Sequence, residues 1–436
     1  MLRNFYNVFI LLICISLISV GCSNSSTSTN KNNTEEGLSG KLEIQYFVGG
    51  FGEAWWKEVI ADFQKDHPDL EIVQHAGAKI NEQMKPRWIS NDPPDVVYID
   101  GPALDEQQLV KDGQLLDITD WYKEAKSPNG QKISDLIVSQ PKTYQEGKIY
   151  SVPIINSFYG LWYDKTLLEE KGWEEPTDFN SFLKVMEMAK NDGMYGLTYP
   201  GGYPLYVWRG LFEPAFIAEG GIQALEDVNQ LKEGVFLSKP IQNGLAKIKQ
   251  LVDNDLIDPG AVALDHMGAQ MQHLQHKALF YPTGLWLPGE MAKDTPDNFK
   301  YGLVPPVVQD DGEEFPISVY PYRLAIAKEA DNKEAAKEFV RFVFQEKYAT
   351  SFVKQTQNLF NYKMDLSNVD GIESYVVESA EILENENVNL RTTGTAEPLD
   401  MRKVLLDATI AFLSNKISAK EWGERLEKEA KNIRND

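Results

Sequence analysis

Short apolar runs alternate along this chain with amphipathic stretches of helical period, and this alternation restricts the fold more than any other feature. Leu42–Phe47 alternates in the manner of a strand, and Glu53–His67 then repeats apolar residues at helical spacing until Pro68. Val96–Ile99 is a continuous apolar run, which is typical of a strand buried on both faces. Such a β-α-β order predicts an α/β domain whose ligands bind at the carboxyl ends of the strands.

The same alternation continues to the end of the chain. The further predicted strands are Leu70–Val73, Gly160–Tyr163 and Leu324–Ala327. The further predicted helices are Ala103–Lys111, Phe179–Asn191, Ile241–Asn254, Lys333–Gln345 and the charged tail Met401–Asn432. The 436 residues contain no internal repeat and are enough for two or three domains.

Charge excludes two classes of partner. The chain carries 65 acidic against 43 basic side chains, a formal charge of −22. Nucleic acid would repel this charge, so the electrostatic footprint of a nucleic-acid-binding protein is absent. A polybasic patch for anionic lipids is absent for the same reason.

The N-terminus reads as an export signal. The apolar stretch Val8–Val20 would span about 20 Å as a helix, which is shorter than a bilayer core. We therefore expect a signal peptide over residues 1–21. The following Cys22 resembles the lipidated cysteine of bacterial lipoproteins, although Ser19 stands where that motif has Leu. The alternative is an incidental cysteine in an ordinary secretory signal.

The residues that follow the predicted signal peptide are consistent with a membrane tether. Residues 22–40 are rich in Ser, Asn and Thr and are expected to form a flexible linker after the lipidated cysteine. The expected location is outside the cell, anchored to the outer face of the cell membrane.

The sequence offers few groups for covalent or metal chemistry. Its two cysteines, Cys14 and Cys22, both lie near the N-terminus, so the folded part has no disulfide framework and no thiolate site. No P-loop or serine elbow is present. His266, His273 and His276 fall in one segment, but their spacing favours an exposed polar helix face over a metal pair. We expect no catalytic residue, no metal and no cofactor.

Two other local patterns each allow more than one interpretation. The turn Val48–Gly52 follows a strand and opens a helix, as a backbone close to a ligand or a plain tight turn would. Glu53, Asp100 and Glu213 lie beside glycine or aromatic residues at the expected ends of elements. They are candidate hydrogen-bond acceptors for a polar ligand, surface charges, or the paired acids of a glycosidase.

Aromatic residues cluster on three segments too rich in Gly and Pro for a core element. These segments are Tyr199–Arg209, Phe280–Gly289 and Tyr320–Arg323. Rings on loops can stack on the apolar face of a pyranose while polar side chains bond its hydroxyl groups. Any one ring could equally pack in a core, but three such loops together favour ligand contact.

Several short motifs of this chain resemble those of a known protein family. Pro94-Asp95-Val96-Val97, the segment Lys111–Thr119 and Gly147–Pro153 are similar to motifs of the extracellular solute-binding proteins, family 1, of carbohydrate ABC importers. Leu161–Lys165, Lys277–Trp286 and Asn332–Phe339 match later motifs of the same family in the same order. The resemblance covers Lys41 to about Lys354.

The resemblance implies an α/β fold of two lobes, of the periplasmic-binding-protein type, with hinge strands and a ligand cleft between the lobes. The lobes would comprise residues 41–153 with 316–360, and 154–315 with 361–436. It further implies capture of a sugar by hinge closure, delivery to the membrane subunits of an ABC permease, a monomeric state and no enzymatic activity.

From the residues and the resemblance together, we also hypothesise which residues bind the ligand. Trp286 and Trp208 would stack on sugar rings, supported by Phe51, Tyr203 and Tyr322. Hydroxyl or acetamido groups would be bonded by Asp100, Glu53, Glu213, Asn156 and Arg323. Gly49–Gly52, Lys79-Ile80 and Pro86-Arg87 resemble a subgroup that binds N-acetylglucosamine and its dimer chitobiose, although Val96–Asp100 is less polar than in that subgroup.

Two other functions stay open from the sequence. One is a surface glycosidase that uses two carboxylates. The other is a binding protein for a non-sugar solute such as a peptide or a metal complex, for which Tyr320 and Tyr322 are candidate iron ligands.

Overall fold

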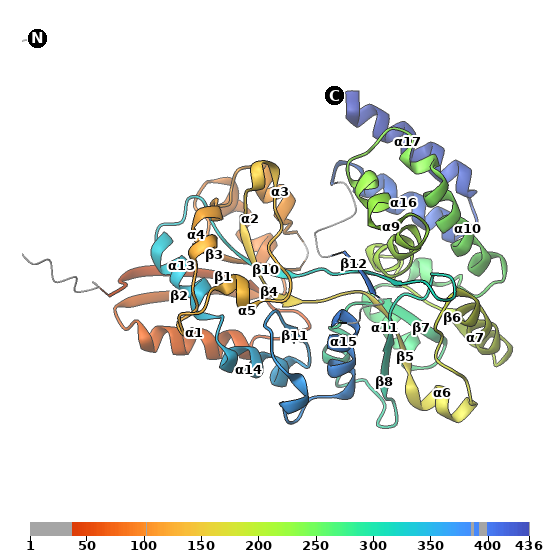
Figure 1. The fold of residues 1–436 in the computed structure, drawn as a ribbon, viewed down its shortest axis with the longest axis horizontal. Coiled ribbons are helices and arrows are strands. Elements are labelled where there is room, and N and C mark those ends of the chain that lie inside the picture. The colour runs from red at the N-terminus through yellow and green to blue at the C-terminus, as the bar shows by residue number, and fades with distance from the viewer. Residues whose placement is uncertain (1–36, 102, 385–387, 392–398, 436) are drawn as a thin grey trace, which may run out of the picture. The chain divides into compact units, whose positions relative to one another are not determined.

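A computed structural model describes residues 37–101, 103–384, 388–391 and 399–435 (Figure 1). The expected signal peptide, Cys14 and Cys22 lie outside these residues. Leu38–Asp436 forms one unit of the chain, and the following description concerns that unit. In its described part, no helix has both the length and the apolar character needed to cross a membrane.

The first sheet has six strands in the order β11-β4-β10-β3-β1-β2. Their bounds are β1 (Gly40–Phe47), β2 (Leu70–Gly77), β3 (Val96–Ile99), β4 (Ser151–Asn156), β10 (Tyr322–Ile326) and β11 (Leu359–Phe360). Strand β1 is parallel to β2 and β3, whereas β10 is antiparallel to β3 and to β4. The carboxyl ends of β1, β3 and β4 therefore lie at one edge, together with the start of β10.

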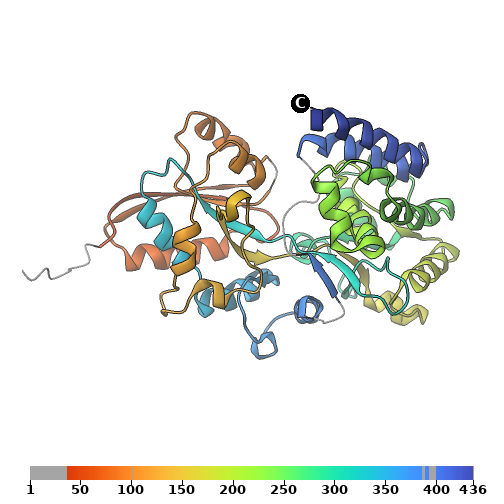
Figure 2. The ribbon, with the colours of Figure 1, turned by 45° about the horizontal axis from the view of Figure 1, so that its top comes forward.

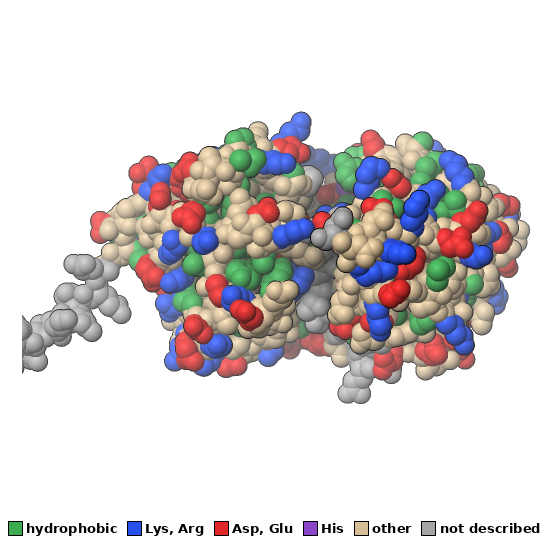
Figure 3. Space-filling view, turned by 90° about the horizontal axis from the view of Figure 1, so that it is seen from above, with side chains coloured by type: hydrophobic (Ala, Val, Ile, Leu, Met, Phe, Trp, Pro, Cys, Tyr) green, Lys and Arg blue, Asp and Glu red, His purple; other side chains and the backbone are tan. Residues whose placement is uncertain are grey.

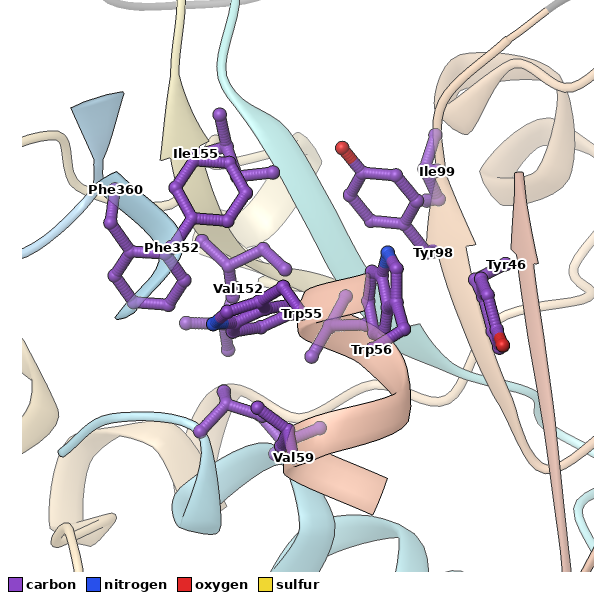
Figure 4. Packing of buried hydrophobic residues seen from close by; sticks show 14 of the residues in the cluster. Tyr46, Trp55, Trp56, Val59, Tyr98, Ile99, Val152, Ile155, Phe352 and Phe360 are labelled. Atoms are coloured by element: carbon purple, nitrogen blue, oxygen red, sulfur yellow. The ribbon is translucent and has the colours of Figure 1, made fainter. Parts of the chain in front are cut away.

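Helices pack against this sheet through aromatic side chains. Their bounds are α1 (Ala54–Asp66), α2 (Ile80–Ile89), α3 (Glu106–Lys111), α4 (Thr119–Glu124), α5 (Ile133–Leu136), α13 (Lys333–Phe342) and α14 (Glu346–Thr356). The ring of Trp56 lies 4.9 Å from that of Tyr46 and 4.9 Å from that of Tyr98 (Figure 4). Its neighbour Trp55 packs against Phe352 and Phe360 (Figure 4). The apolar face predicted for α1 is therefore buried.

The second sheet has four strands in the order β6-β7-β5-β8. Their bounds are β5 (Gly160–Asp164), β6 (Tyr195–Leu197), β7 (Ala278–Thr283) and β8 (Tyr301–Val304). Strand β5 is antiparallel to both neighbours, and β6 is parallel to β7. Trp162 of β5 meets the ring of Tyr301, while Tyr163 points to the opposite face and meets Phe280. Both faces of the strand are buried, as its apolar sequence predicts.

The remaining helices of the described residues lie around the second sheet and the strands that lead to and from it. They are α6 (Lys165–Lys171), α7 (Phe179–Asn191), α8 (Leu205–Val207), α9 (Glu213–Asn229), α10 (Lys239–Asp253), α11 (His266–Leu274), α12 (Leu287–Glu290), α15 (Ser374–Glu384), α16 (Arg402–Leu413) and α17 (Ala419–Asn435). Figure 2 shows α16 and α17 beside α9 and α10. Trp422 of α17 is fully buried there, with its ring centre 6.0 Å from that of Phe216 and 6.5 Å from that of Trp208.

The chain passes between the two sheets three times. It leaves the first sheet after β4 and enters the second at β5. It returns from β8 to β10 through β9 (Phe315–Ser318), which pairs in parallel with β12 (Val388–Arg391). It leaves the first sheet again after β11. This confirms the predicted α/β fold with two lobes joined by strands.

One predicted helix begins later than the sequence pattern indicates. The pattern predicts a start at Ala103, but α3 begins at Glu106. The reason is a cap, because the Asp105 carboxylate accepts the backbone N–H of Gln107 at 2.9 Å and that of Gln108 at 3.2 Å.

The acidic side chains do not form one continuous patch on the face drawn in Figure 3. Lys and Arg side chains stand among Asp and Glu over both halves of that face. Elsewhere among the described residues, opposite charges form pairs, such as Lys337 with Glu334 at 2.7 Å. On this face acidic and basic side chains are therefore mixed.

Candidate ligand-binding pocket

A pocket of about 680 Å³ lies at the edge where β1, β3 and β4 end. From the first lobe it is lined by Phe51 after β1, Asp100 after β3 and Tyr322 at the start of β10. From the second lobe it is lined by residues that follow β6 and β7. Its volume falls in the range of about 300–1,000 Å³ that small-molecule sites occupy. The expected cleft between the lobes is therefore present.

The pocket brings together six of the ten residues expected to bind ligand. They are Phe51, Asp100, Tyr203, Trp286, Tyr322 and Arg323. The glycine-rich turn after β1 is closed by a 2.9 Å hydrogen bond from the Gly52 N–H to the Gly49 carbonyl, and Gly50 lines the pocket. The turn is therefore tight, and its backbone borders the candidate ligand space.

Trp208 does not line the pocket. Its side chain is fully buried, its ring stacks on Phe212 at 5.8 Å, and its Nε1 donates to the Glu213 carboxylate at 2.9 Å. The cause is local, because a π-helical turn over Trp208–Phe212 directs this ring into the core. In the same turn Arg209 lines the pocket.

The other three expected residues also lie away from the pocket. Glu213 is fully buried, where it accepts hydrogen bonds from Trp208 and from the Tyr320 hydroxyl. Asn156 is buried and donates to the Asn361 side chain at 2.9 Å. Glu53 is exposed before α1 and pairs with Lys57 at 2.5 Å. Glu213 is therefore connected to the pocket through Tyr320, which lines it.

A group of aromatic rings forms one wall of the pocket. Tyr159 lies at its centre, with ring centres of Trp286 at 5.4 Å, Tyr320 at 5.5 Å and Tyr206 at 5.6 Å, all edge to face. The Arg209 guanidinium lies over the Tyr320 ring at 4.2 Å. Edge-to-face contacts of this kind are favourable, so the rings of the wall support one another.

Two histidines depart from the expected exposed helix face. His273 is 1% exposed, and burial lowers its pKa to about 4, so its ring is neutral at pH 7. His266 lines the pocket, with its Nε2 2.6 Å from Glu290 Oε2. The pattern of three histidines predicted neither position. Within the described ranges, no group of three His, Cys, Asp or Glu side chains is placed to hold a metal ion.

Asp100 is the pocket carboxyl with the most altered ionisation. Burial raises its pKa to about 7, and the negative charge of Glu290 adds to the rise. The backbone N–H of Gly101 donates to its Oδ1 at 2.6 Å and opposes the shift. Near neutral pH this side chain is therefore present both as an acid and as a carboxylate.

Most other charges in the pocket form pairs within the protein. Asp105 accepts from Arg402 at 2.9 Å, which links α3 of the first lobe to α16 of the second. Glu106 lies 3.5 Å from the Arg323 guanidinium. The lining holds four acidic and four basic side chains besides His266: Asp100, Asp105, Glu106, Glu290, Lys142, Arg209, Arg323 and Arg402. The balance of charge favours an uncharged polar ligand.

Comparison with known proteins places this geometry in context. A diacetylchitobiose-binding protein of Streptomyces coelicolor is 26% identical over 407 residues, which cover 91% of this chain and 85% of that protein. A melibiose/raffinose/stachyose-binding protein of Bacillus subtilis is 23% identical, covering 73% of this chain and 74% of that protein. The solved structure of a chitin oligosaccharide binding protein superposes with a TM-score of 0.72 at 18% identity, covering 90% of this chain and 98% of the other.

Residues 50–350 match the family described as bacterial extracellular solute-binding protein. That span includes the whole of the second sheet, four of the six strands of the first, and most of the pocket lining. The chain therefore belongs to the bacterial extracellular solute-binding protein family.

Proposed function

We propose that this chain is the substrate-binding lipoprotein of an ABC importer and captures an uncharged sugar or short oligosaccharide. The observation that carries the proposal is the pocket, which combines aromatic rings from both lobes with a balanced set of charges. Flat apolar rings suit the faces of a pyranose, and carboxylates and guanidinium groups suit its hydroxyl groups.

The ligand would contact both lobes. In this proposal Trp286 and Tyr203 stack on sugar rings from the second lobe, and Phe51 and Tyr322 pack from the first. Tyr203 is 53% exposed and Trp286 is 8% exposed, so the stacking surface of Trp286 is the small part of its ring that lines the pocket. Asp100 and Arg323 would bond hydroxyl groups.

Hinge closure would deliver the captured sugar. We assign residues 41–153 with 316–360 to one lobe, and 154–315 with 361–436 to the other. A ligand that contacts both lobes stabilises their closed arrangement by its difference in affinity for the open and closed forms. The closed form would then dock on the permease of the importer. Export and a lipid anchor on Cys22 complete the proposal.

The named relatives support a sugar and suggest which one. Two of them are described as binding diacetylchitobiose and melibiose, raffinose or stachyose, and a structural relative as binding chitin oligosaccharides. All of these are uncharged, which agrees with the charge balance of the pocket. N-acetylglucosamine and chitobiose are accordingly the first ligands to test.

A calorimetric panel tests the proposal. The purified protein is titrated with N,N'-diacetylchitobiose, melibiose, raffinose, a tripeptide and ferric citrate. Saturable binding of one sugar, with none of the peptide or the iron complex, is the expected result. Absence of binding by every sugar contradicts the proposal.

A glycosidase remains the second candidate, because Asp100, with its raised pKa, and Glu290 line the same pocket. Chromogenic N-acetylglucosaminides and galactosides test it in parallel. If the wild type hydrolyses one of these substrates faster than an Asp100→Asn variant does, the protein is a glycosidase and the proposal of sugar capture is wrong.

A further inference from the structure

Two short helical segments face one another beside the pocket and share one carboxylate. Trp286 and Glu290 lie one turn apart at α12, where the Glu290 N–H donates to the Trp286 carbonyl at 3.0 Å. His266 and Gln270 lie one turn apart on α11. His266 Nε2 is 2.6 Å from Glu290 Oε2, and the Gln270 amide donates to the same oxygen at 2.8 Å.

These contacts leave the two oxygens of Glu290 in different environments. Oε2 has two donors from α11, so the carboxylate is fixed in orientation. Among the described residues no donor contacts Oε1. That oxygen lies 3.2 Å from the place that a Cβ on Gly50 would occupy, and both Gly50 and Glu290 line the pocket. A fixed acceptor therefore borders the space proposed for the ligand.

We propose that Glu290, held by His266 and Gln270, is a specificity-determining residue that accepts a ligand hydroxyl or acetamido N–H and rejects anionic sugars. The inference rests on the proposed function. An ionised carboxylate accepts a hydrogen bond from a neutral sugar and repels a uronate carboxylate at the same position. The edge-to-face contacts of Tyr206 with His266 at 5.4 Å and Trp286 at 5.7 Å hold the assembly against the aromatic wall.

His266 is a positioning residue in this scheme. With its Nε2–H donated to Glu290, it fixes the orientation of the acceptor. Loss of the His266 side chain is expected to weaken sugar binding. Because the charge of Glu290 remains, the preference for neutral over anionic sugars should be kept.

Two substitutions at one position separate charge from shape. Glu290→Gln keeps the size and removes the charge, whereas Glu290→Asp keeps the charge and withdraws it from the pocket. The ligands are N,N'-diacetylchitobiose and the same sugar with one primary hydroxyl oxidised to a carboxylate. Calorimetry gives the ratio of the two dissociation constants, and thermal unfolding shows that each variant is folded.

The wild type is expected to prefer the neutral sugar. Glu290→Gln should raise the dissociation constant of the neutral sugar about tenfold, the amount typical of a lost charged hydrogen bond. The same variant should reduce the preference for the neutral over the anionic sugar, measured as the ratio of their dissociation constants, by about tenfold. Glu290→Asp and His266→Ala should weaken binding of both sugars and leave the ratio of their dissociation constants unchanged. Glu174→Gln, which removes one exposed carboxylate outside the pocket, should change neither the affinities nor their ratio.

The outcomes distinguish the two proposals. If the wild type binds the neutral sugar and Glu290→Gln leaves the ratio unchanged, the role assigned to Glu290 is wrong while sugar capture stands. If the wild type binds no sugar of the panel, sugar capture itself is wrong.

Discussion

Gly50 of the first lobe lies so close to Trp286 of the second that a Cβ added to the glycine would come within 2.8 Å of the Trp286 Cβ. The same added atom would come within 2.8 Å of Glu290 Cγ. The turn after β1 and the start of α12 are thus in backbone-close contact at the pocket.

Trp286→Ala is expected to weaken sugar binding more than any other single aromatic truncation in the pocket. The ring forms part of the wall around Tyr159, so its loss removes both stacking surface and the support of its neighbours. We expect a loss of about 2 kcal/mol, or roughly 30-fold in the dissociation constant. Calorimetry measures it, with Trp173→Ala, a ring outside the pocket, as the control. Unchanged affinity would show that the ligand binds elsewhere.

Gly50→Val is expected to separate the turn from α12. The new side chain would overlap Trp286 and Glu290, so the two lobes could not approach as closely at this point. Sugar affinity should fall about tenfold or more. Gly202→Ala is the control, because a Cβ there meets its nearest atom at an ordinary 3.5 Å. Equal effects of the two substitutions on binding would contradict the proposed contact.

Asp100 is expected to make sugar affinity depend on pH near neutrality. Its pKa of about 7 means that the carboxylate, the better acceptor for a hydroxyl, becomes dominant as the pH rises through 7. Affinity should therefore increase between pH 6 and 8, and Asp100→Asn should flatten the profile. Titrations across this range measure it, and a pH dependence retained in Asp100→Asn would assign the effect to another group.

The same group has the opposite influence on stability. Its folded pKa lies above the usual 3.8, so between these values the folded state holds a proton that the unfolded state releases. This contribution to the free energy of unfolding is present below pH 3.8 and is lost as the pH rises towards 7. In urea unfolding experiments, Asp100→Asn should remove this fall in the free energy of unfolding between pH 3.8 and pH 7.

Glu43 is expected to contribute to acid denaturation. It is buried on β1, where it bonds Arg87 at 2.5 Å, His75 at 2.6 Å and Lys41, and its pKa is lowered to about 2 although burial opposes the shift. A pKa depressed from 4.5 to about 2 is equivalent to about 3 kcal/mol of stability, present above pH 4.5 and lost as the pH falls towards 2.

Urea unfolding between pH 2.5 and 7 measures this contribution. Glu43→Gln should lower the free energy of unfolding at pH 7 and flatten its decline below pH 4.5. Glu71→Gln, at an exposed position of β2, is the matched control and should leave the profile unchanged. A variant at Glu43 as stable as the wild type at pH 7 would mean that the charge cluster contributes nothing.

The periodic parts of the sequence predict the fold well. The apolar run Val96–Ile99 and the amphipathic stretch Phe179–Asn191 have the bounds of β3 and α7, since burial decides both the pattern and the structure. The two-lobed architecture is confirmed, and the family assignment that the motif order suggested is confirmed as well. The start of α3 was missed because the cap at Asp105 depends on one side chain rather than on a period.

The pocket was predictable only in part. Trp208 and Trp286 occur in similar Gly- and Pro-rich surroundings, yet the π-helical turn buries the first and the turn after β7 brings the second to the pocket. Nothing in the composition of the two segments separates them. Glu290 was overlooked although it lies four residues after Trp286, a spacing that places both on one helical face.

The crystal structure of the protein with N,N'-diacetylchitobiose tests the central claim most directly. The proposal predicts sugar density in the pocket between the lobes, in contact with Trp286 and within hydrogen-bond distance of Asp100. Sugar bound outside this pocket, or a pocket that stays empty at saturating sugar, would contradict it.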